Sequence, residues 1–324
     1  MPADGALEIH SAPFLTVIVP VHCGEQWLDE TLQSLAAEVR DGVEVLVIDS
    51  SPDEGTAAVV RRFADRIPLE LMRRPDLANW RTKTNFGVGR ARAAHVCTLH
   101  QDDLWLPGRL DAVRAWIESA PQAALHLAPT AIIDRDGRTL GTWRCPLPAD
   151  APAPASLVLE RLLVQNFVAI PSPVWRRDAW LACGGLDFDL WYTADWDVWL
   201  KLASAGPVHY HDTVTAAFRI HDSSLTVTGS RDPKDFEAQM RTVLDRHIGR
   251  LPPSRSAPVG RAARASIRIN IALAAASAGG FGALVGAAGQ LLALGPLGMV
   301  RYLRDSRLAE RIAPRLRAKL SGAF

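Results

Sequence analysis

Cysteine is scarce in this sequence, and the cysteines are not spaced as they are in metal sites or redox pairs. The four cysteines are Cys23, Cys97, Cys145 and Cys183, and no two of them make a C-x-x-C pair. Zinc sites and redox-active dithiols depend on closely spaced cysteines. We therefore expect reduced and mostly buried thiols, as is usual for a cytoplasmic protein, rather than disulfides or zinc ligands.

An excess of one charge, a targeting segment and the common phosphate-binding loops are also missing. The 36 basic and 35 acidic residues give a net charge of +1, which argues against a nucleic-acid partner. Residues 1–13 look like a loose leader without the basic and apolar blocks of a signal peptide. Neither G-x-G-x-x-G nor G-x-x-x-x-G-K-[ST] occurs, so a dinucleotide site and a P-loop are disfavoured.

The chain contains a series of continuous apolar runs, and these alternate with segments whose apolar residues recur at the spacing of a helix. Strands are predicted at residues 14–21, 43–48, 69–72, 94–99, 125–133, 169–175 and 213–220. Helices are predicted at residues 25–40, 56–66, 82–93, 107–119 and 156–164, and from residue 195 onward. Strands and helices in alternation predict βαβ units, a parallel sheet and a sizeable core.

Two adjacent carboxylates, Asp102 and Asp103, come directly after the strand predicted at 94–99. Open α/β sheets bind ligands at the carboxyl ends of their strands. Paired carboxylates at such an end are suited to Mg²⁺ or Mn²⁺ on a diphosphate. The alternative is an acidic turn in which Asp103 caps a helix that begins near Pro107.

Two further strand-to-helix loops, residues 21–25 and 49–55, should face the same edge of the sheet. Asp49 stands at the tip of the second strand, where a carboxylate suits a ribose hydroxyl or a base N–H. Its alternative role is to cap the next helix or to brace the turn.

The composition changes after Gly249, so we divide the chain into residues 14–249 and a helical extension, residues 250–324. Residues 269–300 carry no charge, which is long enough for a membrane span. Because Ala and Gly dominate this run, we expect packed helices broken near Gly279-Gly280 and Gly295-Pro296. The arginines that follow fit either a peripheral membrane contact or a solvated helix face.

Six motifs stand in a fixed order along the chain. They are Thr16–Val21 with Glu25, Val47–Thr56, Asn85-Phe86-Gly87, Gln101–Pro107, Cys183–Asp187 with Ala194–Leu200, and Phe218–His221. In order and spacing they resemble the motifs of the family 2 inverting glycosyltransferases, from Phe14 to about Ser224. The resemblance implies a GT-A fold over residues 14–249, a Rossmann-like mixed α/β sheet flanked by helices, with an α-helical C-terminal extension.

The resemblance also implies roles for the matching residues. It implies that the nucleotide sugar is bound by Pro20, Val21, Glu25, Asp49, Asn85, Gln101 and Asp102. It implies that Mn²⁺ or Mg²⁺ is held by Asp102, Asp103 and His221 and that Asp195 is the catalytic base. The implied partners are a nucleotide-diphosphate sugar and a glycan or lipid-linked acceptor. The chain departs from the family pattern at Ser50, His100 and Ala194, where the family commonly has acidic residues.

Two other functions belong to the same kind of fold. A sugar-nucleotide nucleotidyltransferase would carry basic residues in the loop after the first strand, and residues 21–25 have none. A catalytically silent nucleotide- or carbohydrate-binding module should have lost Asp102 or Asp195, and both are present. The simpler roles are a helix cap for Asp195 and a structural part for His221. Five tryptophans fit sugar stacking and core packing equally well: Trp175, Trp180, Trp191, Trp196 and Trp199.

Overall fold

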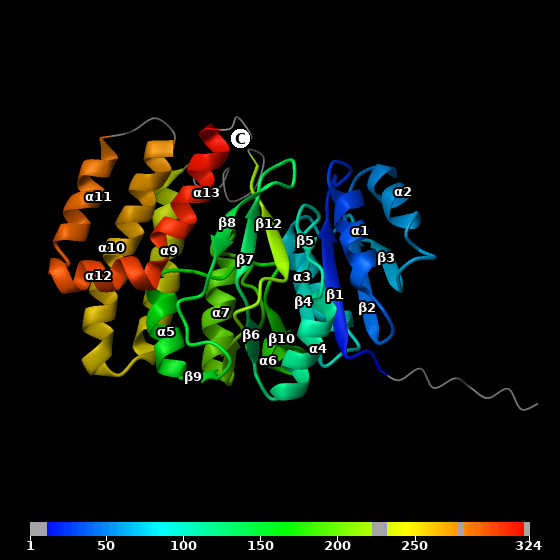
Figure 1. Ribbon diagram of the computed structural model, residues 1–324, viewed down its shortest axis with the longest axis horizontal. Coiled ribbons are helices and arrows are strands. Elements are labelled where there is room, and N and C mark those ends of the chain that lie inside the picture. The colour runs from blue at the N-terminus through cyan, green and yellow to red at the C-terminus, as the bar shows by residue number, and fades with distance from the viewer. Residues whose placement is uncertain (1–11, 222–231, 278–281, 321–324) are drawn as a thin grey trace, which may run out of the picture.

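The computed structural model describes residues 12–221, 232–277 and 282–320 of the chain (Figure 1). The larger of two sheets has the strand order β3-β2-β1-β4-β10-β6-β11-β9. Its strands are β1 (Leu15–Val21), β2 (Val43–Asp49), β3 (Leu69–Arg73), β4 (His95–Thr98), β6 (Leu125–Leu127), β9 (Pro152–Ala153), β10 (Val174–Arg176) and β11 (Val208–Tyr210). The smaller sheet, in the order β5-β12-β7-β8, contains β5 (Leu104–Trp105), β7 (Thr130–Ile133), β8 (Thr139–Trp143) and β12 (Ala216–Arg219).

The predicted helices are present, with most of their ends shifted by a few residues, and two helices that were not predicted, residues 177–182 and 233–247, join them. They are α1 (Leu28–Glu38), α2 (Gly55–Arg61), α3 (Trp80–Arg90), α4 (Arg109–Ser119), α5 (Ala155–Val164), α6 (Arg177–Ala182), α7 (Ala194–Ala205), α9 (Pro233–His247), the 3-10 turn η2 (Ile248–Arg250), α10 (Pro253–Ser277), α11 (Ala283–Leu292), α12 (Gly295–Ser306) and α13 (Leu308–Leu320). Figure 1 shows β1–β3 with α1 and α2 at one end of the molecule and α10–α12 at the other.

The strand β1 is buried on both faces, because its successive side chains enter two different apolar cores. Val17 and Val19 pack in one cluster with Leu32 of α1 and Val113 of α4. Ile18 packs in the other cluster, which also contains side chains of α3, α5 and α7. Helices on both faces therefore hold the sheet so that the carboxyl ends of β1, β2 and β4 lie at one edge.

The sheet is mixed, as the resemblance implies, and not parallel throughout, as the alternation alone predicts. The strands β3, β2, β1 and β4 are parallel, but β10 runs antiparallel to both β4 and β6. An apolar run records that a strand is buried and carries no information about its direction. The expectation of a parallel sheet was wrong for this reason.

Two predicted strands are shorter than expected, and prolines explain both. The run 125–133 is divided at Pro129 into β6 and β7, which belong to different sheets. In the run 169–175 only its end is strand, since Pro171 and Pro173 precede β10. Proline has no backbone N–H to donate to a sheet ladder, so an apolar run that contains it is interrupted.

The helical extension shares a core with the preceding domain. Val259, Ala263 and Ile267 of α10 are buried in the same cluster as Leu162 of α5 and Trp199 of α7. The composition of the chain changes at Gly249, but the apolar core continues across this position. The domain boundary predicted there stays a prediction. Within the described part of the chain, no single helix is long and apolar enough to span a membrane; α11 and α12 pass that test only together, as a pair bent by 114°.

One of the two predicted helix breaks is confirmed. The helix α11 ends at Leu292, and α12 begins at Gly295, whose φ of +71° is a conformation that glycine adopts without strain. The break predicted near Gly279-Gly280 and most of the leader (residues 1–11) lie outside the described residues.

Candidate active site

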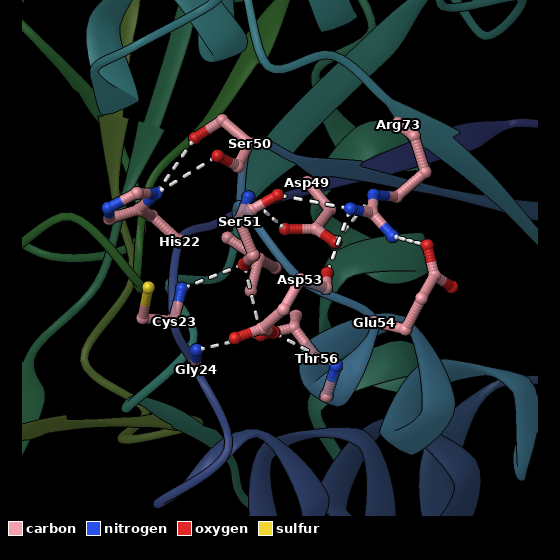
Figure 2. Close-up of polar contacts among 12 residues, drawn as sticks. His22, Cys23, Gly24, Asp49, Ser50, Ser51, Asp53, Glu54, Thr56 and Arg73 are labelled. Atoms are coloured by element: carbon pink, nitrogen blue, oxygen red, sulfur yellow. Dashed lines mark hydrogen bonds and ion pairs between the residues drawn. The ribbon is translucent and has the colours of Figure 1, made fainter.

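The loop after β2 is closed around the carboxylate of Asp49, which is completely buried (Figure 2). Asp49 Oδ1 accepts a hydrogen bond from the backbone N–H of Ser51 at 2.7 Å. Arg73 lies opposite Asp49 in the register of β2 and β3, and its Nε is 3.2 Å from Asp49 Oδ2. Arg73 also donates to the carbonyl oxygens of Ser51 and Asp53 at 3.0 and 2.8 Å. Asp49 thus braces the turn, and Arg73, which the sequence analysis did not select, fixes the loop's shape.

The loop after β1 is bound to the loop after β2 by backbone N–H groups (Figure 2). The N–H of Cys23 donates to Ser51 Oγ at 2.8 Å, and the N–H of Gly24 donates to Thr56 Oγ1 at 3.1 Å. Thr56 in turn donates to Glu25 Oε1 at 2.7 Å, and this hydrogen bond lowers the pKa of Glu25. Glu25 therefore holds the two loops together as a carboxylate.

Gln101 and Lys83 connect the end of β4 and the helix α3 to the first loop. Gln101 Oε1 accepts from the N–H of His22 at 2.7 Å, and its Nε2 donates to the His22 carbonyl at 3.1 Å. Lys83 is buried and donates to the carbonyl of Val21 at 2.5 Å. Burial lowers the pKa of Lys83 to about 8. Pro20 and Val21 are themselves buried at the strand end, so they shape this edge through the backbone.

The amide of Asn85 makes three hydrogen bonds inside the protein. Its Nδ2 donates to the carbonyl of Leu186 at 2.8 Å, and its Oδ1 accepts from Trp180 Nε1 at 3.1 Å and from the N–H of Leu186 at 3.0 Å. A Cβ at Gly185 would lie 2.5 Å from Asn85 Oδ1, so the glycine is needed for this approach. Asn85 therefore positions the segment that leads to α7, and the donor contact implied for it stays a prediction.

Of the three metal ligands that the resemblance implies, Asp102 lies beside both Asp103 and His221, but His221 is not part of the closest group of candidate ligand atoms. His221 Nε2 lies 2.9 Å from Asp102 Oδ2. One oxygen of each of the two carboxylates and a ring nitrogen of His100 lie within 4.8 Å of one another. His100, which stands where the family commonly has an acidic residue, is thus a further candidate ligand.

Asp103 is not a helix cap. The helix α4 begins after Gly108, and the N–H groups of Gly108 and Leu110 donate to the carboxylate of Glu38, not to Asp103. Asp103 is buried, its Oδ1 accepts from the N–H of Arg219 at 3.0 Å, and its Oδ2 has no hydrogen-bond partner. Burial and the neighbouring Asp102 raise the pKa of Asp103 well above its ordinary value. A divalent cation would satisfy the unpaired oxygen and offset the repulsion, so the donor set fits Mn²⁺ or Mg²⁺.

Asp195 lies at the start of α7, where its carboxylate accepts two hydrogen bonds. Asn166 Nδ2 donates to Oδ2 at 2.9 Å, and the N–H of Trp196 donates to Oδ1 at 2.8 Å. Burial raises the pKa of Asp195 to about 6. No cationic side chain of the described residues forms an ion pair with it, so the carboxylate is available to take up a proton.

Asp197, two residues further along α7, has a different environment. It is paired with His247 at 2.8 Å, with Lys201 at 2.7 Å and with Arg246 at 3.0 Å. Burial tends to raise its pKa, but the hydrogen bonds from His247 and Lys201 outweigh burial and lower it to about 2. A fully paired carboxylate holds α7 against α9 and is a poor proton acceptor.

Asp102 and Asp195 line one cavity of about 220 Å³. Four tryptophans also line it: Trp80, Trp143, Trp191 and Trp196. Trp175, Trp180 and Trp199 instead stack on one another in the core, with ring centroids 4.6 to 6.4 Å apart. The five tryptophans selected from the sequence are thus divided between cavity and core, and Trp80 and Trp143 were not among them. Aromatic faces beside carboxylates suit a sugar ring.

The comparison with known families agrees with this arrangement. Residues 16–153 match the model of glycosyl transferase family 2. This part of the chain is thus similar to glycosyl transferase family 2. The amylovoran biosynthesis glycosyltransferase AmsE of Erwinia amylovora is 26% identical over 191 residues, which are 55% of this chain and 65% of that relative.

Solved structures confirm the GT-A fold. S. aureus TarS 1–349 in complex with UDP-GlcNAc has a TM-score of 0.61 at 18% identity and covers 78% of this chain and 72% of that one. The mannosyltransferase PcManGT from Pyrobaculum calidifontis, in complex with GDP-Man and Mn²⁺, has a TM-score of 0.57 at 20% identity, with 98% and 90% covered. The family 2 match and the named relatives, such as AmsE, identify the chain as a glycosyltransferase. Asp195 and His221 lie beyond the residues that match the family 2 model.

Proposed function

We propose that this glycosyltransferase moves a sugar from a nucleotide-diphosphate sugar to a hydroxyl group of a glycan or lipid-linked acceptor, with inversion at the anomeric carbon. The observation that carries the proposal is the shared cavity of Asp102 and Asp195. Two carboxylates thus lie on the walls of one space, and we assign one to the cation and the other to the proton of the acceptor. The nucleotide sugars in the complexes of TarS and PcManGT support a donor of this class.

For the donor, we assign the nucleoside to the braced loops after β1 and β2. Asp49 and Arg73 fix the turn on which the base and the ribose would rest, and Glu25 with Gln101 holds the adjoining loop. Lys83, a buried cation at the same strand ends, would favour the negative charge of the diphosphate. Preorganised contacts of this kind limit the entropy that is lost when the donor binds.

For the metal ion, we assign Asp102, Asp103 and His221, together with His100. Mn²⁺ or Mg²⁺ held there would stabilise negative charge on the leaving diphosphate. The Mn²⁺ in the PcManGT complex supports this choice of ion. Arg219 holds the motif in place, since its Nε donates to the carbonyl of Asp102 at 2.8 Å and its N–H to Asp103.

For the chemistry, we assign Asp195 as the base that removes the proton of the acceptor hydroxyl. Among the described residues that line the cavity, Asp102 and Asp195 are the carboxylates. If Asp102 binds the cation, Asp195 is the one carboxylate left to act on the acceptor. A single base that activates the acceptor hydroxyl is what a one-step displacement with inversion requires. A silent binding module would have no need of an unpaired aspartate whose pKa is about 6 beside the metal motif.

A nucleoside-diphosphate panel tests the proposed function. The melting temperature should rise by several degrees with one nucleoside diphosphate plus Mn²⁺, because a ligand at 100 times its Kd stabilises by about 2.7 kcal/mol. The measurement is thermal unfolding with each nucleotide, with and without Mn²⁺, and with the nucleosides as controls. A melting temperature that no nucleotide changes would contradict nucleotide-sugar binding.

We also propose that α11 and α12 contact a membrane surface. Six of the nine large apolar side chains that are exposed among the described residues belong to these helices: Leu284, Val285, Leu292, Leu297, Val300 and Leu303. Nearby arginines are paired, Arg304 with Asp305 at 2.8 Å and Arg307 with Glu310 at 3.4 Å, so we assign the contact mainly to the apolar side chains.

Sedimentation with lipid vesicles tests the membrane contact. The protein should sediment with vesicles of phosphatidylcholine and phosphatidylglycerol, and Leu297→Glu combined with Val300→Glu should abolish this, because two charges would have to enter the lipid interface. Leu181→Glu, a change at a 47% exposed leucine on α6, is the matched control and should sediment like the parent. If the parent stays in the supernatant, the contact does not exist.

A further inference from the structure

Two arginines of the helical extension line the cavity that contains Asp102 and Asp195. Arg311 and Arg315 are one turn apart on α13, which packs beside β8 (Figure 1). Their side chains are half-buried. Because α13 is more than a hundred residues from either aspartate along the chain, only the fold brings these cations to the cavity.

Neither arginine is neutralised by a carboxylate of the described residues. Arg311 Nη2 donates to Asn270 Oδ1 at 2.8 Å, whereas its Nε and Nη1 are buried without a hydrogen-bond partner. Arg315 Nη1 donates to the carbonyl of Arg311 at 2.8 Å. Burial, and next the positive charge of Arg315, lowers the pKa of Arg311 to about 10, so Arg311 stays charged at neutral pH. A cation whose Nε and Nη1 are buried without a partner costs free energy unless an anion joins it.

Tyr192 and Trp143 line the cavity together with the two arginines. Tyr192 precedes α7, and its phenol is close enough to Arg315, Arg311 and Asp195 for all three charges to affect its pKa, which burial raises. Arg311 also lies over the ring of Trp143, with 5.8 Å from its guanidinium carbon to the ring centroid. The donor phosphates are assigned to Asp102 and Lys83 at the strand ends, so the space near the arginines is left for the acceptor.

We propose that Arg311 and Arg315 bind a phosphate ester group of the acceptor and so direct its hydroxyl group towards Asp195. The inference rests on the proposed function, because it takes the cavity as the place of glycosyl transfer. Two guanidinium groups match a phosphate in charge and in geometry, since each offers parallel N–H donors to its oxygens. The phosphate can belong to a lipid carrier or to a phosphorylated glycan.

Binding of simple phosphates, measured without donor or metal, tests the subsite. Inorganic phosphate, octyl phosphate and glucose 6-phosphate are titrated by calorimetry into the parent, Arg311→Gln, Arg315→Gln and the double variant. Each single change should weaken binding about ten- to a hundredfold, as expected for a lost charged hydrogen bond. Arg317→Gln, a change at an exposed arginine of the same helix, should bind like the parent.

The outcomes distinguish this inference from the proposed function. Tighter binding of octyl phosphate than of the other two assigns the phosphate to a lipid carrier, and tighter binding of glucose 6-phosphate assigns it to a glycan. Equal binding of phosphates by the parent and the double variant overturns the subsite. UDP with Mn²⁺ should bind equally to both, and a parallel loss of UDP binding would place the arginines at the donor instead. Phosphate binding without any nucleotide binding would support the subsite and contradict the proposed function.

The melting temperature provides a second readout that does not require the ligand. If the arginines serve the ligand, Arg311→Gln should melt at the same temperature as the parent or higher, because an unpaired buried charge has been removed. If they are structural, the melting temperature should fall. Should the double variant not fold, Arg311→Lys keeps the charge but loses the planar fork, and a tenfold weaker binding of phosphate would still support the subsite.

Discussion

Turnover should fall by a factor on the order of a hundred or more when Asp195 is replaced by Asn, while the donor should still bind as it does to the parent. The asparagine oxygen can keep the hydrogen bond from the Trp196 N–H, whereas its NH2 group cannot accept the one from Asn166, so unfolding curves are needed as a check of the fold. The amide cannot take up the proton of the acceptor hydroxyl. The measurement is nucleoside-diphosphate release in the presence of the acceptor, together with calorimetry of donor binding.

The same assignment predicts how the rate depends on pH. A base works in its deprotonated form, and the pKa of Asp195 is raised to about 6. Turnover of the parent should therefore be constant above about pH 7 and fall about tenfold per pH unit below pH 6. An acid limb at the ordinary aspartate pKa would show that another group is the base.

Asp197→Asn is the matched control for Asp195→Asn. Its carboxylate is buried among His247, Lys201 and Arg246, so the change should lower the melting temperature. Turnover per folded molecule should stay near that of the parent. If Asp195→Asn keeps most of its turnover, Asp195 is a helix cap and not the base.

Asp102→Ala should abolish the part of nucleoside-diphosphate binding that depends on Mn²⁺. Asp102 shares the site with His100, Asp103 and His221, and loss of its carboxylate removes a ligand of the ion. The side chain is 23% exposed, so the fold should tolerate the change. The measurement is calorimetry of the nucleotide with and without Mn²⁺, with unfolding curves as a check of the fold.

Asp111→Ala, at an exposed aspartate of α4, is the control for a general effect of lost negative charge. It should bind the nucleotide and Mn²⁺ like the parent. Equally tight Mn²⁺-dependent binding by Asp102→Ala would show that the ion is held elsewhere.

The sequence by itself determined the positions at which strands end and polar side chains begin. Asp49, Asp102 and Asp195 were selected because each follows an apolar run or begins a helical one, and local periodicity encodes such boundaries. The order of the motifs then identified the GT-A fold. The proximity of Asp102 to His221 followed from the resemblance and not from periodicity.

Only the tertiary structure decided which side chains complete the site. Arg73 meets Asp49 across a strand pair, Arg219 reaches Asp103 over 116 residues, and Arg311 enters the cavity from α13. The sequence pattern likewise did not show that β10 runs antiparallel to β4. Burial patterns record whether a residue faces a core but not which distant partner it meets there. Contacts between residues far apart in the chain are set when the layers pack, and the far wall of this cavity is made of such contacts.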